Sequence, residues 1–109
     1  MTDAQKQHIE TYKSIIEQVE GVELKGKTMP YTSTNGHMFS QLNKDGEIGI
    51  RLSKERQSEF FSNGLQPFKS YGAVMQGYIL VSEEMLSNID QVVELMKEGL
   101  EYVQSLEPK

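Results

Sequence analysis

The chain has 109 residues, 37% of them hydrophobic and 25% charged, which is the composition of one ordinary globular domain over residues 1–109. It contains no cysteine, so disulfides, thiolate zinc sites and cysteine nucleophiles are excluded. The formal net charge is −5, and without a dense basic face we do not expect direct binding to nucleic acid.

The polar N-terminus and the lack of long apolar runs indicate the cellular location of the protein. Its first residues lack the apolar core of a signal peptide, and no stretch approaches the roughly 18 apolar residues of a membrane helix. We therefore expect a cytoplasmic protein without membrane association. Residues 25–69 carry a small excess of Lys and Arg whereas both flanks are acidic, which we interpret as surface charge that keeps the protein in solution.

An amphipathic helix is predicted at the start of the chain. Thr2 and Gln5 form a capping box, and Gly21 is a suitable C-terminal stop. Apolar side chains recur between these signals at steps of three and four, namely Ile9, Tyr12, Ile16 and Val19. His8 lies one position off this stripe, so we expect a solvated residue at its edge.

A β-hairpin forms the centre of the predicted sheet. Its strands, 38–42 and 48–52, flank an Asp-Gly pair that suits the positive φ of a tight turn. The second strand alternates strictly, so its two isoleucines and its leucine face one way while Gly49 and Arg51 face the other. We expect the apolar face to pack against helices, and the opposite face to be either covered or open to solvent.

The segment before this hairpin predicts one strand and one loop. Residues 22–27 alternate and indicate a first strand at the edge of the sheet. Residues 28–36 are expected to form a polar loop, because Pro30 lacks a backbone donor and Asn35-Gly36 is a turn signal.

After the hairpin, residues 53–63 predict a helix with Ser53 as its N-cap. Residues 65–69 indicate a short edge segment, and residues 76–81 have the composition of a buried last strand. In that strand we expect Tyr78 to pack in the core with its hydroxyl hydrogen-bonded.

A helical turn at residues 82–84 and a long final helix from Asn88 end the pattern. The apolar seam of this helix consists of Ile89, Val92, Val93, Met96, Leu100 and Val103. Gly99 interrupts the seam, which indicates a close approach of helix and sheet. The order is helix, three strands, helix, two strands, helix. It predicts a two-layer α+β fold with one antiparallel sheet packed against helices.

No motif of a known catalytic or metal centre is present in the sequence. His8 and His37 are far apart, and the acidic residues near His37 belong to the hairpin turn. We therefore predict no metal site, no cofactor and no catalytic residue.

A few polar and aromatic side chains suit a ligand, although each has a structural alternative. The loop before the hairpin combines Lys27, Tyr31 and His37 with several hydroxyls, which suits an anion or small polar ligand, or equally a connection whose hydroxyls bond turn amides. Arg51 is placed to meet a carboxylate bidentately or to remain a surface residue. Tyr71 is suited to stack on a ligand. These five residues form the candidate ligand-binding set.

Several short segments from residue 27 onwards form a larger pattern: Lys27-Thr28-Met29, Gly36-His37-Met38-Phe39, Ile48-Gly49-Ile50-Arg51-Leu52, Asn63-Gly64-Leu65-Gln66-Pro67-Phe68 and Gly77-Tyr78. In these segments the chain resembles the TfoX N-terminal domain family, in a branch made of this domain alone. The resemblance implies a secretion-chaperone-like fold, α-β(3)-α-β(2)-α. Full-length members regulate competence genes in bacteria and carry a second domain, and the family implies no catalytic residue here.

Two functions remain open at this point. The leading hypothesis is a non-catalytic regulatory or protein-interaction module that acts on a protein partner or as a homodimer. The alternative is a small-molecule or anion-binding protein, or an undetected enzyme, that uses the 27–37 loop and the open sheet face.

Overall fold

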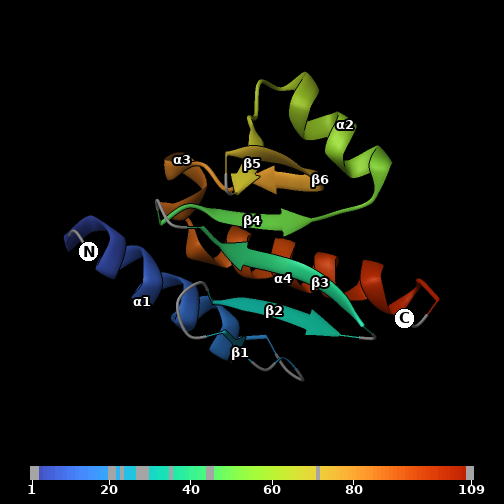
Figure 1. The fold of residues 1–109 in the computed structure, drawn as a ribbon. Coiled ribbons are helices and arrows are strands. Elements are labelled where there is room, and N and C mark those ends of the chain that lie inside the picture. Colours follow the sequence, from blue (N-terminus) through green and yellow to red (C-terminus); the bar gives the residue numbers. More distant parts are fainter. Residues whose placement is uncertain are drawn as a thin grey trace.

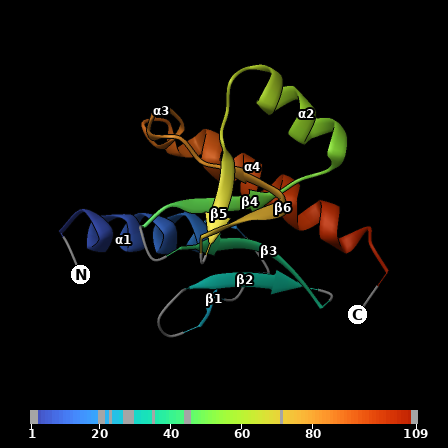
Figure 2. The same ribbon diagram turned by 45° about the horizontal axis from the view of Figure 1, so that its top comes forward.

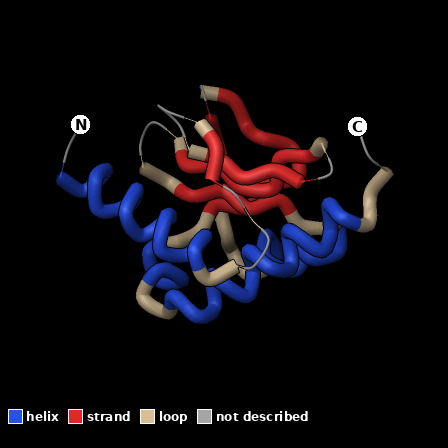
Figure 3. The backbone as a smooth tube through the Cα atoms, turned by 90° about the horizontal axis from the view of Figure 1, so that it is seen from below, coloured by secondary structure: helices blue, strands red, loops and turns tan. Residues whose placement is uncertain are grey.

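The described part of the chain folds into one curled antiparallel sheet of six strands, with helices on one side of it (Figure 1 and Figure 3). This arrangement in the computed structural model confirms the predicted α+β class. The structure describes residues 3–19, 22, 24–26, 30–34, 36–43, 46–70 and 72–107.

The helices are α1 (Asp3–Glu17), α2 (Lys54–Ser62), α3 (Glu83–Leu86) and α4 (Ile89–Gln104). The strands are β1 (Leu24–Lys25), β2 (Tyr31–Thr34), β3 (His37–Leu42), β4 (Ile48–Arg51), β5 (Pro67–Ser70) and β6 (Ala73–Leu80). Across the sheet they follow the order β1-β2-β3-β4-β6-β5, and each strand is antiparallel to its neighbours.

β2 is an additional strand, and the prediction of a polar loop over residues 28–36 is wrong for this segment. β2 lies between β1 and β3, and its Thr32 is fully buried. Pro30 lies just before the strand, where its missing donor costs nothing, and its carbonyl accepts a hydrogen bond from the backbone N–H of Leu42 at 2.9 Å. Tyr and Thr both suit a pleated strand. The predicted turn follows at Gly36, which has a φ of 81°, while Asn35 is outside the described residues.

A bulge in β3 brings two consecutive side chains to the helical side of the sheet. Thr32 pairs with Ser40 and Ser33 pairs with Met38, so Phe39 is an extra residue in β3. Ser40 bonds to a side chain of α1, and Phe39 lies 3.6 Å from the position that a Cβ of Gly99 in α4 would take. The bulge therefore supplies both a polar and an apolar contact to the helices.

α4 approaches the sheet closely at Gly99, as predicted. A Cβ atom there would lie 2.9 Å from the carbonyl oxygen of Arg51 and 3.2 Å from Cγ2 of Ile50. The main core fills this interface between the helices and the sheet. Its fully buried members include Tyr12, Ile15, Phe39, Ile48, Ile50, Val92, Met96 and Val103.

The opposite face of the sheet is covered over β4. A Cβ atom on Gly49 would lie 2.3 Å from the ring of Phe68 in β5, so the missing side chain leaves room for that ring. Tyr78 packs beside Phe68 with the ring centroids 6.1 Å apart, and its hydroxyl donates to the carbonyl of Met38 at 2.7 Å. β6 bends at Gly77, where φ is 91°, so that β5 and the first part of β6 cross over β4 (Figure 2). The core position predicted for Tyr78 is confirmed.

Candidate functional site

His37 binds the segment that follows α4. It is the first residue of β3, and its side chain is buried, with 8% of the residue exposed. Its Nε2 lies 2.7 Å from the backbone carbonyl of Glu107. A carbonyl oxygen only accepts, so Nε2 carries a proton and donates this hydrogen bond. In the described part of the chain Nδ1 is buried without a partner. This geometry gives His37 a structural role at the end of α4.

Arg51 lies at the same end of the sheet as His37 and beside α4. Its guanidinium carbon is 5.6 Å from the ring centroid of Tyr102, a cation–π contact. Burial raises the pKa of Tyr78 to about 12, and the positive charge of Arg51 partly opposes this rise. Among the residues that the structure describes, Arg51 has no carboxylate partner. It is half-buried, so this charge is available to an anion.

The other candidate residues do not join Arg51 and His37 in one cluster. Tyr31 is half-buried at the start of β2 and is paired with Gln41, whereas His37 is opposite Thr34 at the far end of that strand. Lys27 and Tyr71 are outside the described residues. The described members of the predicted set therefore do not form one cluster, since Tyr31 lies at the opposite end of its strand from the end near His37 and Arg51.

A buried group of three hydroxyls lies between α1 and the sheet. Tyr12 Oη is 2.6 Å from Ser40 Oγ, and Ser40 Oγ also bonds to Thr32 Oγ1. All three residues are fully buried, and burial raises the pKa of Tyr12 well above its usual range. A tyrosine in the otherwise aliphatic stripe of α1 was the available sequence signal, because a buried phenol needs a hydrogen-bond partner.

His8 is held by two contacts, and the expectation of a solvated edge residue is wrong. Its Nδ1 donates to the carbonyl of Gly46 at 2.6 Å, and its Nε2 lies 3.6 Å from the carboxylate of Glu83. These contacts tie α1 to the β3–β4 turn and to α3. The periodicity of α1 could not reveal them, because both partners are distant in sequence.

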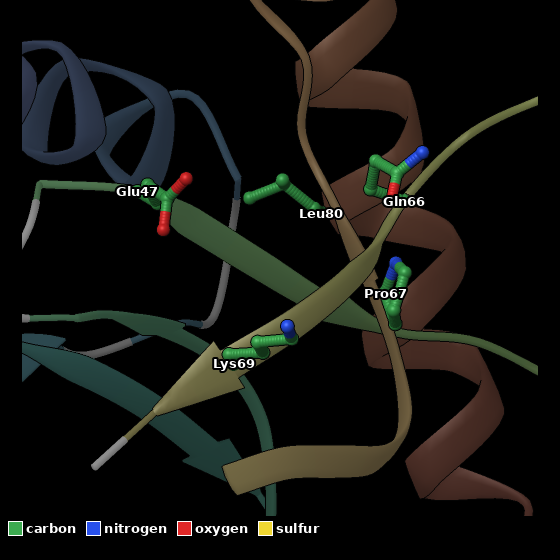
Figure 4. A pocket seen from close by; sticks show the side chains of 5 residues that line it. All are labelled: Glu47, Gln66, Pro67, Lys69 and Leu80. Carbon is green, nitrogen blue, oxygen red and sulfur yellow. The ribbon is translucent and has the colours of Figure 1, made fainter. Parts of the chain in front are cut away.

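A hollow of about 220 Å³ lies between β5, the start of β4 and the end of β6 (Figure 4). Its lining residues are Glu47, Gln66, Pro67, Lys69 and Leu80. Sequence reasoning missed this site, because Glu47 was assigned to a turn and Lys69 to an edge segment with no local pattern to join them. Its volume is below the roughly 300–1,000 Å³ of drug-sized ligand pockets, which suits a small molecule.

Comparison with known proteins gives no family for this chain. No protein-family model matches it, and no match was found among curated proteins. The described ranges also contain no group of three or more His, Asp or Glu residues that could hold a metal ion. No helix within the same ranges is long and apolar enough to cross a membrane.

Proposed function

We propose that the chain is a non-catalytic interaction module of the regulatory kind that the TfoX resemblance implies, and that α2 meets its protein partner. One observation carries this proposal. All nine residues of α2 are described and none of them is buried. Helices of globular proteins normally bury an apolar stripe. Phe60 packs against the core while staying partly exposed. A helix without a single fully buried side chain offers much of its surface to another molecule.

The way α2 is held supports this role. Ser53 Oγ caps the helix by accepting from the backbone N–H of Arg56, and the Gln57 amide donates to the carbonyl of Leu52 at 2.7 Å. The Arg56 guanidinium lies 4.8 Å from the Phe60 ring centroid and 3.1 Å from the Glu98 carboxylate. These contacts fix α2 without covering Phe61, which is 39% exposed. In Figure 1 and Figure 2 the helix projects beyond the sheet.

In this proposal the chain acts in the bacterial cytoplasm on a protein partner, or on a second copy of itself. Full burial of an exposed Phe side chain is worth about 1.5–3 kcal/mol, and a partner that covers the exposed 39% of Phe61 would gain a fraction of this. The mixed charges of Lys54, Glu55 and Glu59 on α2 suit a polar rim around such a pocket.

Photo-crosslinking tests the proposal in the native host. A photoreactive phenylalanine analogue replaces Phe61 in one version of the chain and Gln104, an exposed residue of α4, in a control version. We expect a discrete crosslinked species from position 61 that position 104 does not give, and mass spectrometry then identifies the partner. No discrete species from position 61, or the same species from both positions, would contradict the proposal.

A second candidate function is the binding of a small anion at Arg51. Two observations favour it. The Arg51 guanidinium is half-buried beside Tyr102, and it has no carboxylate partner in the described ranges. Arginine binds carboxylates and phosphates through two parallel hydrogen bonds, so this position suits an anionic metabolite or an acidic side chain.

A further inference from the structure

We infer that the hollow between β5 and the start of β4 binds a small zwitterion of the amino-acid class, with Lys69 meeting its carboxylate and Glu47 its ammonium group. This site is separate from α2 and from Arg51. The inference therefore does not depend on the proposed interaction role.

Two opposite charges line the same hollow without meeting each other. Glu47 and Lys69 both belong to its lining (Figure 4). Within the described residues neither of them takes part in an ion pair, although pairs form elsewhere between Arg56 and Glu98 and between Lys97 and Glu94. A ligand that carries both charges would pair with both side chains.

One buried amide, that of Asn43, bonds to both charged residues of the site. Asn43 is 6% exposed, and its Oδ1 accepts from the backbone N–H of Glu47 at 2.9 Å. Its Nδ2 donates to Glu47 Oε1 at 3.0 Å and to the carbonyl of Lys69 at 2.7 Å. The Asn43 side chain thus orients the carboxylate of Glu47 and anchors β5, the strand that carries Lys69. Such support reduces the ordering cost of binding.

The second carboxylate oxygen of Glu47 is left for a ligand. Oε1 is occupied by the Asn43 amide, whereas Oε2 accepts no hydrogen bond from the part of the chain that the structure describes. An ammonium group offers three donors and suits this position. Gln66 also lines the hollow. Its backbone carbonyl accepts a hydrogen bond from the N–H of Leu80 at 3.1 Å, so its side-chain amide is the group that it offers to a ligand.

Size and apolar surface narrow the ligand class. The volume of about 220 Å³ equals that of about seven water molecules, which suits an amino acid with a short side chain. Leu80 and Pro67 supply apolar contact for that side chain. A molecule with a carboxylate, an ammonium group and a few carbon atoms matches all of these features.

Titration of the isotope-labelled protein with each free amino acid tests the inference by NMR. We expect at least one of them to shift the backbone amide signals of Glu47, Gln66, Lys69 and Leu80 in a saturable way. The N-acetyl derivative of that amino acid, which lacks the positive charge, and its carboxamide, which lacks the negative charge, should each bind about tenfold more weakly or worse, since each loses one charge-assisted contact.

Two substitutions and one control complete the experiment. Glu47→Gln keeps the shape of the side chain, and Lys69→Met keeps its length on an exposed strand position, so both variants should retain a dispersed amide spectrum. Each should weaken binding about tenfold or more. Lys97→Met removes another exposed lysine and should leave affinity unchanged. The inference is overturned if no amino acid shifts these signals, if the N-acetyl derivative binds as well as the free amino acid, or if both site variants bind like the parent.

Discussion

The two arginines of this chain meet different surroundings. Arg56 lies between two carboxylates, 2.7 Å from Glu59 and 3.1 Å from Glu98. Arg51 instead lies over the ring of Tyr102, and its described neighbours include no carboxylate partner. A half-buried guanidinium without an ion pair to the described residues is available to an anion from outside.

Arg51 provides the residue-level prediction. In a thermal-shift screen against phosphate, sulfate, nucleotides and small carboxylates, at least one anion should raise the melting temperature by several degrees. A ligand at a hundred times its Kd adds about 2.7 kcal/mol to the free energy of unfolding, which corresponds to such a shift for a domain of this size. Arg51→Ala should remove the shift, whereas Arg51→Lys should retain only part of it.

The control for this screen is Lys54→Ala, which removes an exposed cation at the start of α2. Its response to the anion should equal that of the parent. Loss of the shift in Lys54→Ala as well, or an unchanged shift in Arg51→Ala, would mean that Arg51 is not the binding group.

At the scale of elements, the β5–β6 hairpin gives the sheet a second packed face. Phe68 lies over Gly49, Tyr78 reaches across to the carbonyl of Met38, and Asn43 bonds to the carbonyl of Lys69. The hairpin therefore joins the turn of β3 and β4 to the edge of the sheet. The same hairpin lines the hollow through Pro67, Lys69 and Leu80, so packing and the proposed ligand site share one element.

Gly49→Ala tests this packing. The new methyl group would lie 2.3 Å from the Phe68 ring. The β5–β6 hairpin would have to move to remove this steric clash. Overpacking of this kind costs about 1–3 kcal/mol, so urea denaturation should show a free energy of unfolding lower by that amount.

A double-mutant cycle with Phe68→Leu separates this clash from a simple loss of glycine. In the Phe68→Leu background the smaller side chain makes room, and Gly49→Ala should cost less than it does in the parent. An equal cost in both backgrounds would show that the Phe68 ring does not lie over Gly49.

Two buried tyrosines link the stability of the whole molecule to alkaline pH. The Tyr12 hydroxyl bonds to Ser40 Oγ between α1 and the sheet. The Tyr78 hydroxyl bonds to the carbonyl of Met38 on the other face of the sheet. Burial raises the pKa of Tyr78 to about 12 and raises that of Tyr12 as well. Both phenols are therefore held neutral by the folded state at pH values where an unfolded chain, with a tyrosine pKa near 10, ionises.

The sign of the resulting pH dependence follows from linkage. Below about pH 10 both states keep the phenol proton, so stability is unaffected. Above it the unfolded state loses protons first, and the free energy of unfolding should fall by up to about 1.4 kcal/mol per pH unit for each tyrosine. Urea denaturation of the parent and of Tyr78→Phe between pH 8 and pH 12 measures the free energy of unfolding. We expect this free energy to fall less steeply with pH in the variant than in the parent. Parallel curves would rule out the contribution of Tyr78.

Local patterns predicted most of the fold, because steps of three and four define α1 and α4 and alternation defines β4. β2 could not be predicted in this way, since Thr32 is buried by partners on α1 and β3. The candidate sites depend even more on distant contacts. His37 meets a carbonyl 70 residues away and Asn43 one 26 residues away. No window of the sequence brings such groups together.

The close approach of α4 at Gly99 has a consequence for synthesis on the ribosome. Ile50 and Phe39 lie against α4 near this glycine, yet they leave the ribosome long before the helix does. Until α4 emerges, the nascent chain displays an apolar sheet face, and any chaperone that recognises such surfaces competes with α4 for the same side chains. The docking of α4, which its close approach at Gly99 makes tight, therefore ends the interval in which a chaperone can bind the apolar face of the sheet.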